Sequence, residues 1–156
     1  MSKASSKITD ALNGLLAWEL TSIDQYTDHS EKYADWGFSK LAERISHEAD
    51  DERLHAKMLI ERILYLGAEP NMENRHPLPD ADTVPEMLAA DLELERQNAT
   101  ALKAAIQLCE SEKDFVTRDT LVQILRDTEE DHAYWLRQQL GLIHRLGLER
   151  FLQAMM

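Results

Sequence analysis

The feature that most constrains this chain is a set of acidic residues placed inside apolar helical stripes. Apolar residues recur at the spacing of one helix face in four long stretches, which predicts four amphipathic helices. Glu19 interrupts the first stripe midway between Leu12 and Tyr26, and Glu95 interrupts the third stripe in the same way. Any fold that buries these faces must therefore bury carboxylates as well.

The second and fourth stripes each carry a glutamate that is followed three residues later by a histidine. These pairs are Glu52 with His55 and Glu129 with His132. On an α-helix this spacing places both side chains on one face, where they can bind one ion. Each predicted helix thus contributes to one site, with two lone glutamates and two Glu-x-x-His pairs.

A metal centre follows from the cost of burying these acids. One buried carboxylate without a partner costs several kcal/mol, so four would exceed the typical stability of about 5–15 kcal/mol. No Lys or Arg occupies these stripe positions. A single glutamate on a helix is usually solvated, but six residues registered on four buried faces argue against that interpretation. Two divalent cations would balance four carboxylates, with one imidazole for each, and carboxylate bridges suit iron.

The connections between the predicted helices are unequal in length. We expect helices at about 6–36, 39–67, 84–110 and 114–144, with a short fifth helix at 147–154. The first two and the last two long helices should form antiparallel hairpins. The segment from about Gly67 to Asp82 is long and contains three prolines, which fits a crossover along the whole bundle. The sequence therefore predicts one all-α domain over residues 1–156.

Composition excludes several classes of partner. The formal net charge of −12 argues against nucleic acid or an anionic membrane, because both require basic surfaces. The opening residues lack the apolar stretch of a signal peptide, and no apolar run approaches the length that spans a bilayer. Cys109 is the only cysteine, so no intrachain disulfide is possible, and a cytoplasmic location is expected.

Beyond these acids, the chain resembles the bacterioferritin family along nearly its whole length. The resemblance is carried by the ligand pattern and by residues 24–26, 35–37, 47–48, 60–64, 85–88, 124–127 and 135–136. It implies a ferritin-like four-helix bundle with one long crossover and a short C-terminal helix. It further implies a hollow shell of twenty-four subunits that stores iron as a ferric mineral.

The resemblance also implies roles for individual residues. The ferroxidase ligands would be Glu19, Glu52, His55, Glu95, Glu129 and His132. Glu52 and Glu129 would bridge two irons, and Glu19 and Glu95 would be terminal ligands. The implied reaction oxidises Fe(II) with dioxygen or hydrogen peroxide and delivers Fe(III) to the cavity.

Two further candidate groups lie near these ligands. Tyr26 shares the face of Glu19 and would supply a hydrogen bond or an electron, or serve only as a core aromatic residue. His47 and Asp51 form an i, i+4 pair in a region that faces the cavity in this family and can hold an extra iron. An exposed polar pair is the alternative interpretation of these two residues.

The chain departs from the family pattern at the haem site. Bacterioferritins bind haem between paired subunits through a methionine directly after the second-helix metal glutamate. Here that residue is Arg53, and Met58 is nearly one and a half turns away. Arginine lacks the thioether that binds haem iron. A cage made only of this subunit is therefore expected to lack Met-ligated haem, whereas mixed shells with a haem-binding sister subunit remain open.

Two other functions are compatible with parts of the pattern. A di-iron peroxidase or oxidase of the rubrerythrin type is one, although the chain has no Cys-x-x-Cys pair for a rubredoxin-like centre. The other is a structural role, either as a partner subunit of a mixed shell or as a small DNA-protecting ferritin. That smaller class places its metal ligands at subunit interfaces, whereas all six candidates here fall within one predicted bundle.

Overall fold

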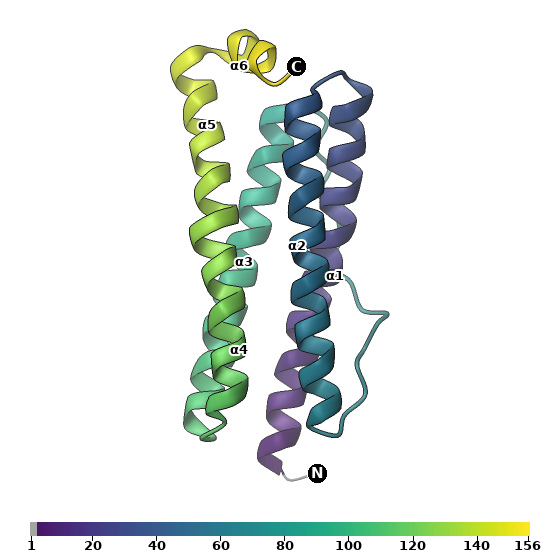
Figure 1. The fold of residues 1–156 in the computed structure, drawn as a ribbon, viewed down its shortest axis with the longest axis vertical. Helices are drawn as coiled ribbons and strands as arrows, with labels where there is room; N and C mark the ends of the chain where they lie inside the picture. Colours follow the sequence, from purple (N-terminus) through teal and green to yellow (C-terminus); the bar gives the residue numbers. More distant parts are fainter. Residues whose placement is uncertain (1–2) are drawn as a thin grey trace.

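Four helical rods stand side by side, and a short helix lies across one end of the bundle (Figure 1). The computed structural model describes residues 3–156, with side chains from residue 6 on, so residues 1 and 2 of the expected domain lie outside it. Within that range every regular element is a helix. The elements are α1 (Lys3–Asp35), α2 (Ser39–Tyr65), α3 (Val84–Ser111), α4 (Phe115–Arg126), η1 (Asp127–Ala133), α5 (Tyr134–Leu146) and α6 (Leu148–Ala154).

The connectivity is that of two hairpins joined by a crossover. A tight turn at Gly37, with φ of +88°, reverses the chain between α1 and α2. Another turn at Lys113, with φ of +60°, reverses it between α3 and α4. The segment between α2 and α3 runs back along the bundle, so these two helices point the same way (Figure 1). The predicted all-α bundle with one long crossover and a short C-terminal helix is confirmed.

Side chains of α1 fix the crossover in place. Asn13 accepts a hydrogen bond from the backbone N–H of Asn71 at 2.8 Å, and Thr21 accepts one from the backbone N–H of His76 at 2.8 Å. The imidazole of His76 stacks on the Trp18 ring, with ring centroids 3.6 Å apart. These contacts satisfy part of the backbone of a segment without regular structure.

The N-terminus of α3 carries a capping box. The Thr83 hydroxyl accepts a hydrogen bond from the Glu86 backbone N–H, and the Glu86 carboxylate accepts one from the Thr83 backbone N–H. Pro85 lies in the first turn, where its missing N–H costs nothing. The end of the crossover and the start of α3 are therefore fixed by local sequence.

The predicted fourth helix differs from the structure in its middle. The segment η1 between α4 and α5 is π-helical, so each backbone N–H bonds to the carbonyl five residues earlier. A π turn holds more residues than an α turn, and it changes which side chains share a face. Thr128 and His132 of η1 are buried in the bundle, whereas the Glu129 side chain is turned towards the surface.

The apolar core is divided into two clusters along the bundle. The upper cluster in Figure 1 includes Tyr33, Leu41, Leu88, Leu136 and Phe151, the last of which is contributed by α6. The lower cluster includes Leu12, Leu59, Ile63, Leu102 and Leu121. On every long helix the predicted ligands fall between residues of the two clusters. None of the helices in the described part is long and apolar enough to cross a membrane.

Candidate metal centre

Five of the six predicted ligands converge between the two apolar clusters. Glu19 comes from α1, Glu52 and His55 from α2, Glu95 from α3 and His132 from η1, and none is more than 2% exposed. They form two overlapping groups in which the ligand atoms lie within 4.8 Å of one another. Glu52 belongs to both groups, with Glu19 and His55 in one and with Glu95 and His132 in the other.

Both histidines turn the same ring nitrogen towards the buried acids. His55 Nδ1 lies 3.5 Å from a Glu52 oxygen and 3.7 Å from Glu19 Oε2. His132 Nδ1 lies 2.8 Å from the other Glu52 oxygen and 3.3 Å from Glu95 Oε1. The ring centroids are 6.0 Å apart, so each imidazole serves a different half of the centre.

Several buried atoms of the centre lack a partner in hydrogen-bond geometry. They are Glu19 Oε2, both carboxylate oxygens of Glu52, Glu95 Oε2 and His55 Nδ1. Buried polar atoms in proteins are almost always hydrogen-bonded, so five such atoms in one place indicate that a ligand completes the site. Carboxylate oxygens and imidazole nitrogens are the donors that divalent iron accepts. The residues present therefore fit divalent metal ions such as iron.

The remaining oxygen of each lone glutamate is held from the facing helix. The Tyr26 hydroxyl of α1 donates to Glu95 Oε1 on α3. In return, Asn98 of α3 donates from Nδ2 to Glu19 Oε1 on α1 at 3.0 Å. Each glutamate thus has one oxygen held by a hydrogen bond, while its Oε2 is buried without a hydrogen-bond partner. Asn98 was not predicted, although its position three residues after Glu95 places it on the same helix face.

The electrostatics of the centre favour bound protons when no cation is present. Burial raises the pKa of Glu19 to about 8, and the adjacent Glu52 carboxylate adds to the shift. Burial opposes protonation of His55, but the carboxylates of Glu19 and Glu52 outweigh it and raise the pKa of His55 to about 11. The pKa of His132 is likewise raised, against burial, by Glu48, Glu52 and Glu95. Cation binding would have to displace some of these protons.

Glu129 is not brought into this centre. Its side chain is 42% exposed, and Oε1 lies 3.2 Å from the Lys103 ammonium nitrogen. The expectation that Glu129 and His132 share one helix face is wrong for this structure, because η1 is π-helical. The role of Glu129 as a bridging ligand stays a prediction.

The sequence is similar to that of known ferritins. Residues 9–146 match the Ferritin family profile, described as a ferritin-like domain. A bacterial ferritin from Pseudomonas aeruginosa is 56% identical over 150 residues, which cover 95% of this chain and 96% of that protein. A bacterial ferritin from Synechocystis sp. is 49% identical over 99% of both chains. The chain belongs to the bacterioferritin family.

More distant bacterioferritins also align with most of the chain. A bacterioferritin from Mycobacterium avium is 39% identical over 90% of this chain and 87% of its own length. The family match covers α2, α3 and the whole run from α4 to α5, together with most of α1. It therefore includes every residue of the candidate centre.

At the position where bacterioferritins carry their haem-ligating methionine, the structure shows an ion pair. Arg53 Nη1 lies 2.7 Å from the Asp50 carboxylate, and both side chains are more than half exposed. A guanidinium offers no lone pair to haem iron. The residue at this position therefore does not fit Met-ligated haem.

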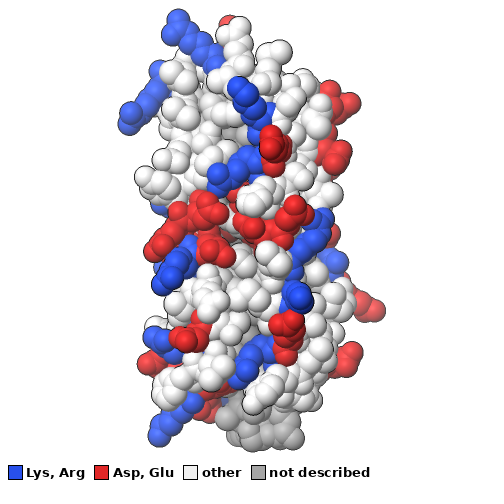
Figure 2. Space-filling view, in the orientation of Figure 1, with Lys and Arg blue, Asp and Glu red and all other residues white. Residues whose placement is uncertain are grey.

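One face of this bacterioferritin-family chain is acidic halfway along the bundle. That face is formed by α2 and by the fourth rod, which consists of α4, η1 and α5 (Figure 2). Figure 2 shows acidic side chains gathered there, at the level of the candidate centre. His47 lies on α2, and its Nε2 atom is 3.7 Å from the Asp51 carboxylate. The predicted pair therefore lies together at the surface, and its role in binding an extra iron stays a prediction.

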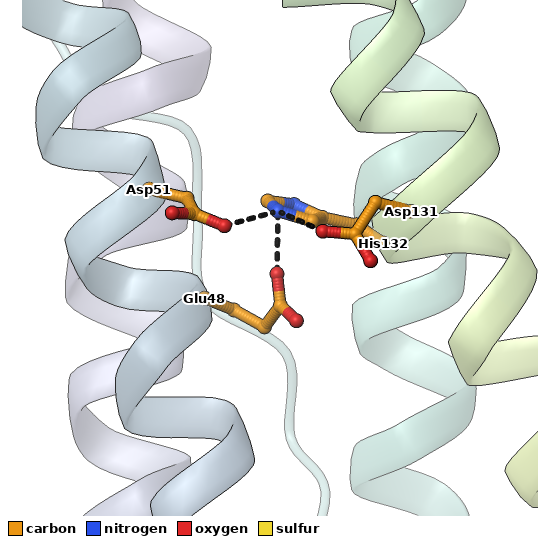
Figure 3. Close-up of side chains that lie close together, drawn as sticks. All are labelled: Glu48, Asp51, Asp131 and His132. Atoms are coloured by element: carbon orange, nitrogen blue, oxygen red, sulfur yellow. Dashed lines mark hydrogen bonds and ion pairs between the residues drawn. The ribbon is translucent and has the colours of Figure 1, made fainter.

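Acidic residues also contact Nε2 of His132, the ring nitrogen that faces away from the centre. Glu48 and Asp51 of α2 point towards His132 Nε2, and Asp131 lies beside them (Figure 3). Asp51 Oδ2 is 3.2 Å from that nitrogen. Sequence reasoning missed Glu48, although it precedes Glu52 by one helical turn on the same buried face.

Proposed function

We propose that this chain is the ferroxidase subunit of an iron-storing cage, and that it oxidises Fe(II) at a site for two ions within its own helical bundle. The observation that carries this proposal is the pair of overlapping buried ligand groups that share Glu52. The names of its relatives, bacterial ferritin and bacterioferritin, support the same conclusion.

The geometry suggests a division of labour among the ligands. Glu19 and His55 would hold one ion, Glu95 and His132 would hold the other, and Glu52 would bridge them. Three carboxylates carry three negative charges against four positive charges on two Fe(II) ions. Glu129 would supply the fourth charge only by leaving Lys103 and turning inwards.

The proposed reaction uses iron as substrate and dioxygen or hydrogen peroxide as oxidant. Two Fe(II) ions supply two electrons, enough to reduce dioxygen to hydrogen peroxide or hydrogen peroxide to water. The protein sets the spacing of the ions and keeps their ligands dry between two apolar clusters. Tyr26 would support the reaction as a hydrogen-bond donor to Glu95, because burial raises its pKa well above the ordinary value and keeps it protonated.

We further propose that Fe(III) leaves this centre for the cavity of a shell of twenty-four subunits in the cytoplasm. Several large apolar side chains are exposed on the single subunit, including Leu54, Tyr65, Phe115 and Val116. Exposed apolar groups of this size are expected where subunits pack together.

An anaerobic Fe(II) titration of the purified assembled protein tests the proposal. We expect binding to saturate at two Fe(II) ions per subunit, followed by a fast oxidation phase when oxygen is admitted. Absorbance of the Fe(III) product after rapid mixing measures that phase. The absence of a binding step near two ions would contradict the proposal, and binding without fast oxidation would favour a structural partner subunit.

Haem reconstitution provides a separate prediction. Because Arg53 replaces the methionine, a homopolymer of this subunit should not bind haem with two methionine ligands at stoichiometric occupancy. Visible absorption and magnetic circular dichroism of the reconstituted protein measure the ligation. The variant Arg53→Met is the matched control, and we expect it to gain haem. A wild-type homopolymer with bis-methionine haem would show that the ligand comes from elsewhere in the chain.

A further inference from the structure

The two buried histidines share an arrangement that the ligand assignment does not use. Each turns Nδ1 towards the centre and presents Nε2 to an acidic side chain on the outer side. For His55 that acid is Asp127, whose Oδ2 atom lies 2.9 Å from Nε2. For His132 two acids lie at Nε2: Glu48 Oε2 makes the closest ion-pair contact, and Asp51 Oδ2 forms a hydrogen bond at 3.2 Å. An acidic side chain therefore lies against Nε2 of the histidine in both halves of the centre.

Such a contact affects metal binding through the orientation of the ring. A neutral imidazole has one lone pair, and it can bind a metal through Nδ1 only if the proton stays on Nε2. A carboxylate that accepts a hydrogen bond from Nε2 fixes both the tautomer and the ring angle, and it makes Nδ1 a stronger donor. Loss of such an outer partner typically weakens metal binding about 10- to 100-fold.

We propose that Asp127 and Glu48 are positioning residues that hold His55 and His132 with Nδ1 turned towards the two metal ions. The inference rests on the proposed function, since it takes both histidines as metal ligands.

The π-helical segment explains how an acid of the fourth rod reaches His55 on α2. Asp127 is the first residue of η1, five residues before His132. Residues five apart lie above one another in a π-helix, so both face the α2 side of the centre. His132 takes its position among the ligands, and Asp127 contacts the second histidine from the outer edge. The Asp127 side chain remains 56% exposed.

Glu48 is held more firmly than Asp127. It is buried, and Arg44 donates from Nε to its other carboxylate oxygen. Arg44 also donates to Asp131 at 2.9 Å, and its guanidinium lies 4.6 Å from the centre of the Trp135 ring. Glu48 is thus held by Arg44, which is itself held by Asp131 and Trp135, whereas more than half of the Asp127 side chain is exposed to solvent. We therefore expect the outer partner of His132 to matter more for metal binding than the outer partner of His55.

Titration of the metal-free assembled protein with Co(II) tests the proposal without relying on iron oxidation. The intensity of the visible Co(II) bands reports each bound ion, and wild-type protein should bind two per subunit. Asp127→Ala and Glu48→Ala should each retain one tight ion and weaken the other by up to about 10- to 100-fold. Glu48→Ala leaves the Asp51 hydrogen bond to His132 in place, so the greatest loss is expected when both acids are removed. Because Asp51 lies near the same nitrogen of His132, a Glu48→Ala, Asp51→Ala double variant removes both acceptors.

Conservative variants separate positioning from a general loss of structure. Asp127→Asn and Glu48→Gln keep a carbonyl oxygen that accepts a hydrogen bond from Nε2, so they should recover much of the affinity that the alanine variants lose. If an alanine variant fails to fold, its amide counterpart should still show a several-fold loss confined to one ion. Glu130→Ala in η1 and Glu43→Ala on α2 are matched controls with exposed acids, and they should bind Co(II) as wild type does.

The outcomes distinguish this inference from the proposed function. Wild-type protein that binds no pair of Co(II) ions would overturn the ferroxidase proposal itself. Wild-type protein that binds two, with Asp127→Ala and the double variant unchanged, would overturn only the positioning role. Equal weakening of both ions in every variant, controls included, would also overturn it, because positioning predicts a loss at one ion.

Discussion

Replacing Glu52 with glutamine should abolish the fast phase of Fe(II) oxidation, with an initial rate lower by on the order of 100-fold or more. Glu52 is the only residue in both ligand groups, and both of its oxygens lack hydrogen-bond partners. Glutamine keeps the size of the side chain but removes the negative charge and one of the two ligand oxygens. Loss of an outer partner already costs about 10- to 100-fold, so loss of a shared ligand should cost at least as much.

Stopped-flow absorbance after mixing Fe(II) with the oxygenated protein measures this effect. The matched control is Glu61→Gln on the same helix, an exposed residue that pairs with Lys57 at 3.8 Å. The control should oxidise Fe(II) at the wild-type rate, and both variants should assemble normally by size-exclusion chromatography. A fast phase of wild-type amplitude in Glu52→Gln would rule out a centre bridged by this residue.

The second large effect concerns pH and stability. Without metal, the protein should lose stability as the pH rises from 6 to 9, whereas protein loaded with Zn(II) should not. Glu19 has a pKa of about 8 in the folded protein, against 4.5 for an ordinary glutamate. Its buried proton is therefore retained at pH values where the unfolded chain has released it.

The histidines act in the same direction. His55 has a pKa of about 11, against an ordinary value of 6.5, so its stabilising effect is complete below about pH 6.5 and is lost as the pH rises towards 11. Between pH 6.5 and 8 the folded protein thus holds more protons than the unfolded chain. Its stability should fall by roughly 1.4 kcal/mol per pH unit for each extra proton. Zn(II) replaces these protons, which removes the dependence.

Scanning calorimetry of the metal-free and Zn(II)-loaded proteins at pH 6, 7, 8 and 9 measures this difference. The variant Glu19→Gln removes one of the retained protons, so its metal-free form should show a shallower decline than wild type. If the melting temperature of metal-free wild-type protein stays constant or rises over this range, Glu19 and His55 do not retain their protons in the folded state.

The helices and most of the centre follow from sequence because they depend on periodicity. A stripe with a period near 3.6 residues specifies both a helix and its buried face, and Glu19, Glu52 and Glu95 lie on those faces. The unequal connections then specify the crossover. Local signals are equally informative at the start of α3, where Thr83 and Glu86 have the Thr-x-x-Glu spacing of the capping box that they form.

The outward position of Glu129 and the residues that sequence reasoning missed have different physical causes. The Glu-x-x-His spacing assumes an α-helix, and it cannot reveal that η1 is π-helical and turns Glu129 outwards. Asn98 and Asp127 act on side chains of other helices. Such cross-helix contacts depend on rotation and height within the bundle, which spacing along one helix does not encode.

The division of the core into two apolar clusters has a consequence for how the chain can vary. Each cluster packs among its own residues, and the polar layer between them holds the candidate ligands. Exchanges of aliphatic side chains near Leu12 or Leu136 alter the packing of one end and leave the spacing of the ligands untouched. We therefore expect the two ends to diverge independently between relatives, and we expect exchanges in the middle layer to disturb the ligands directly.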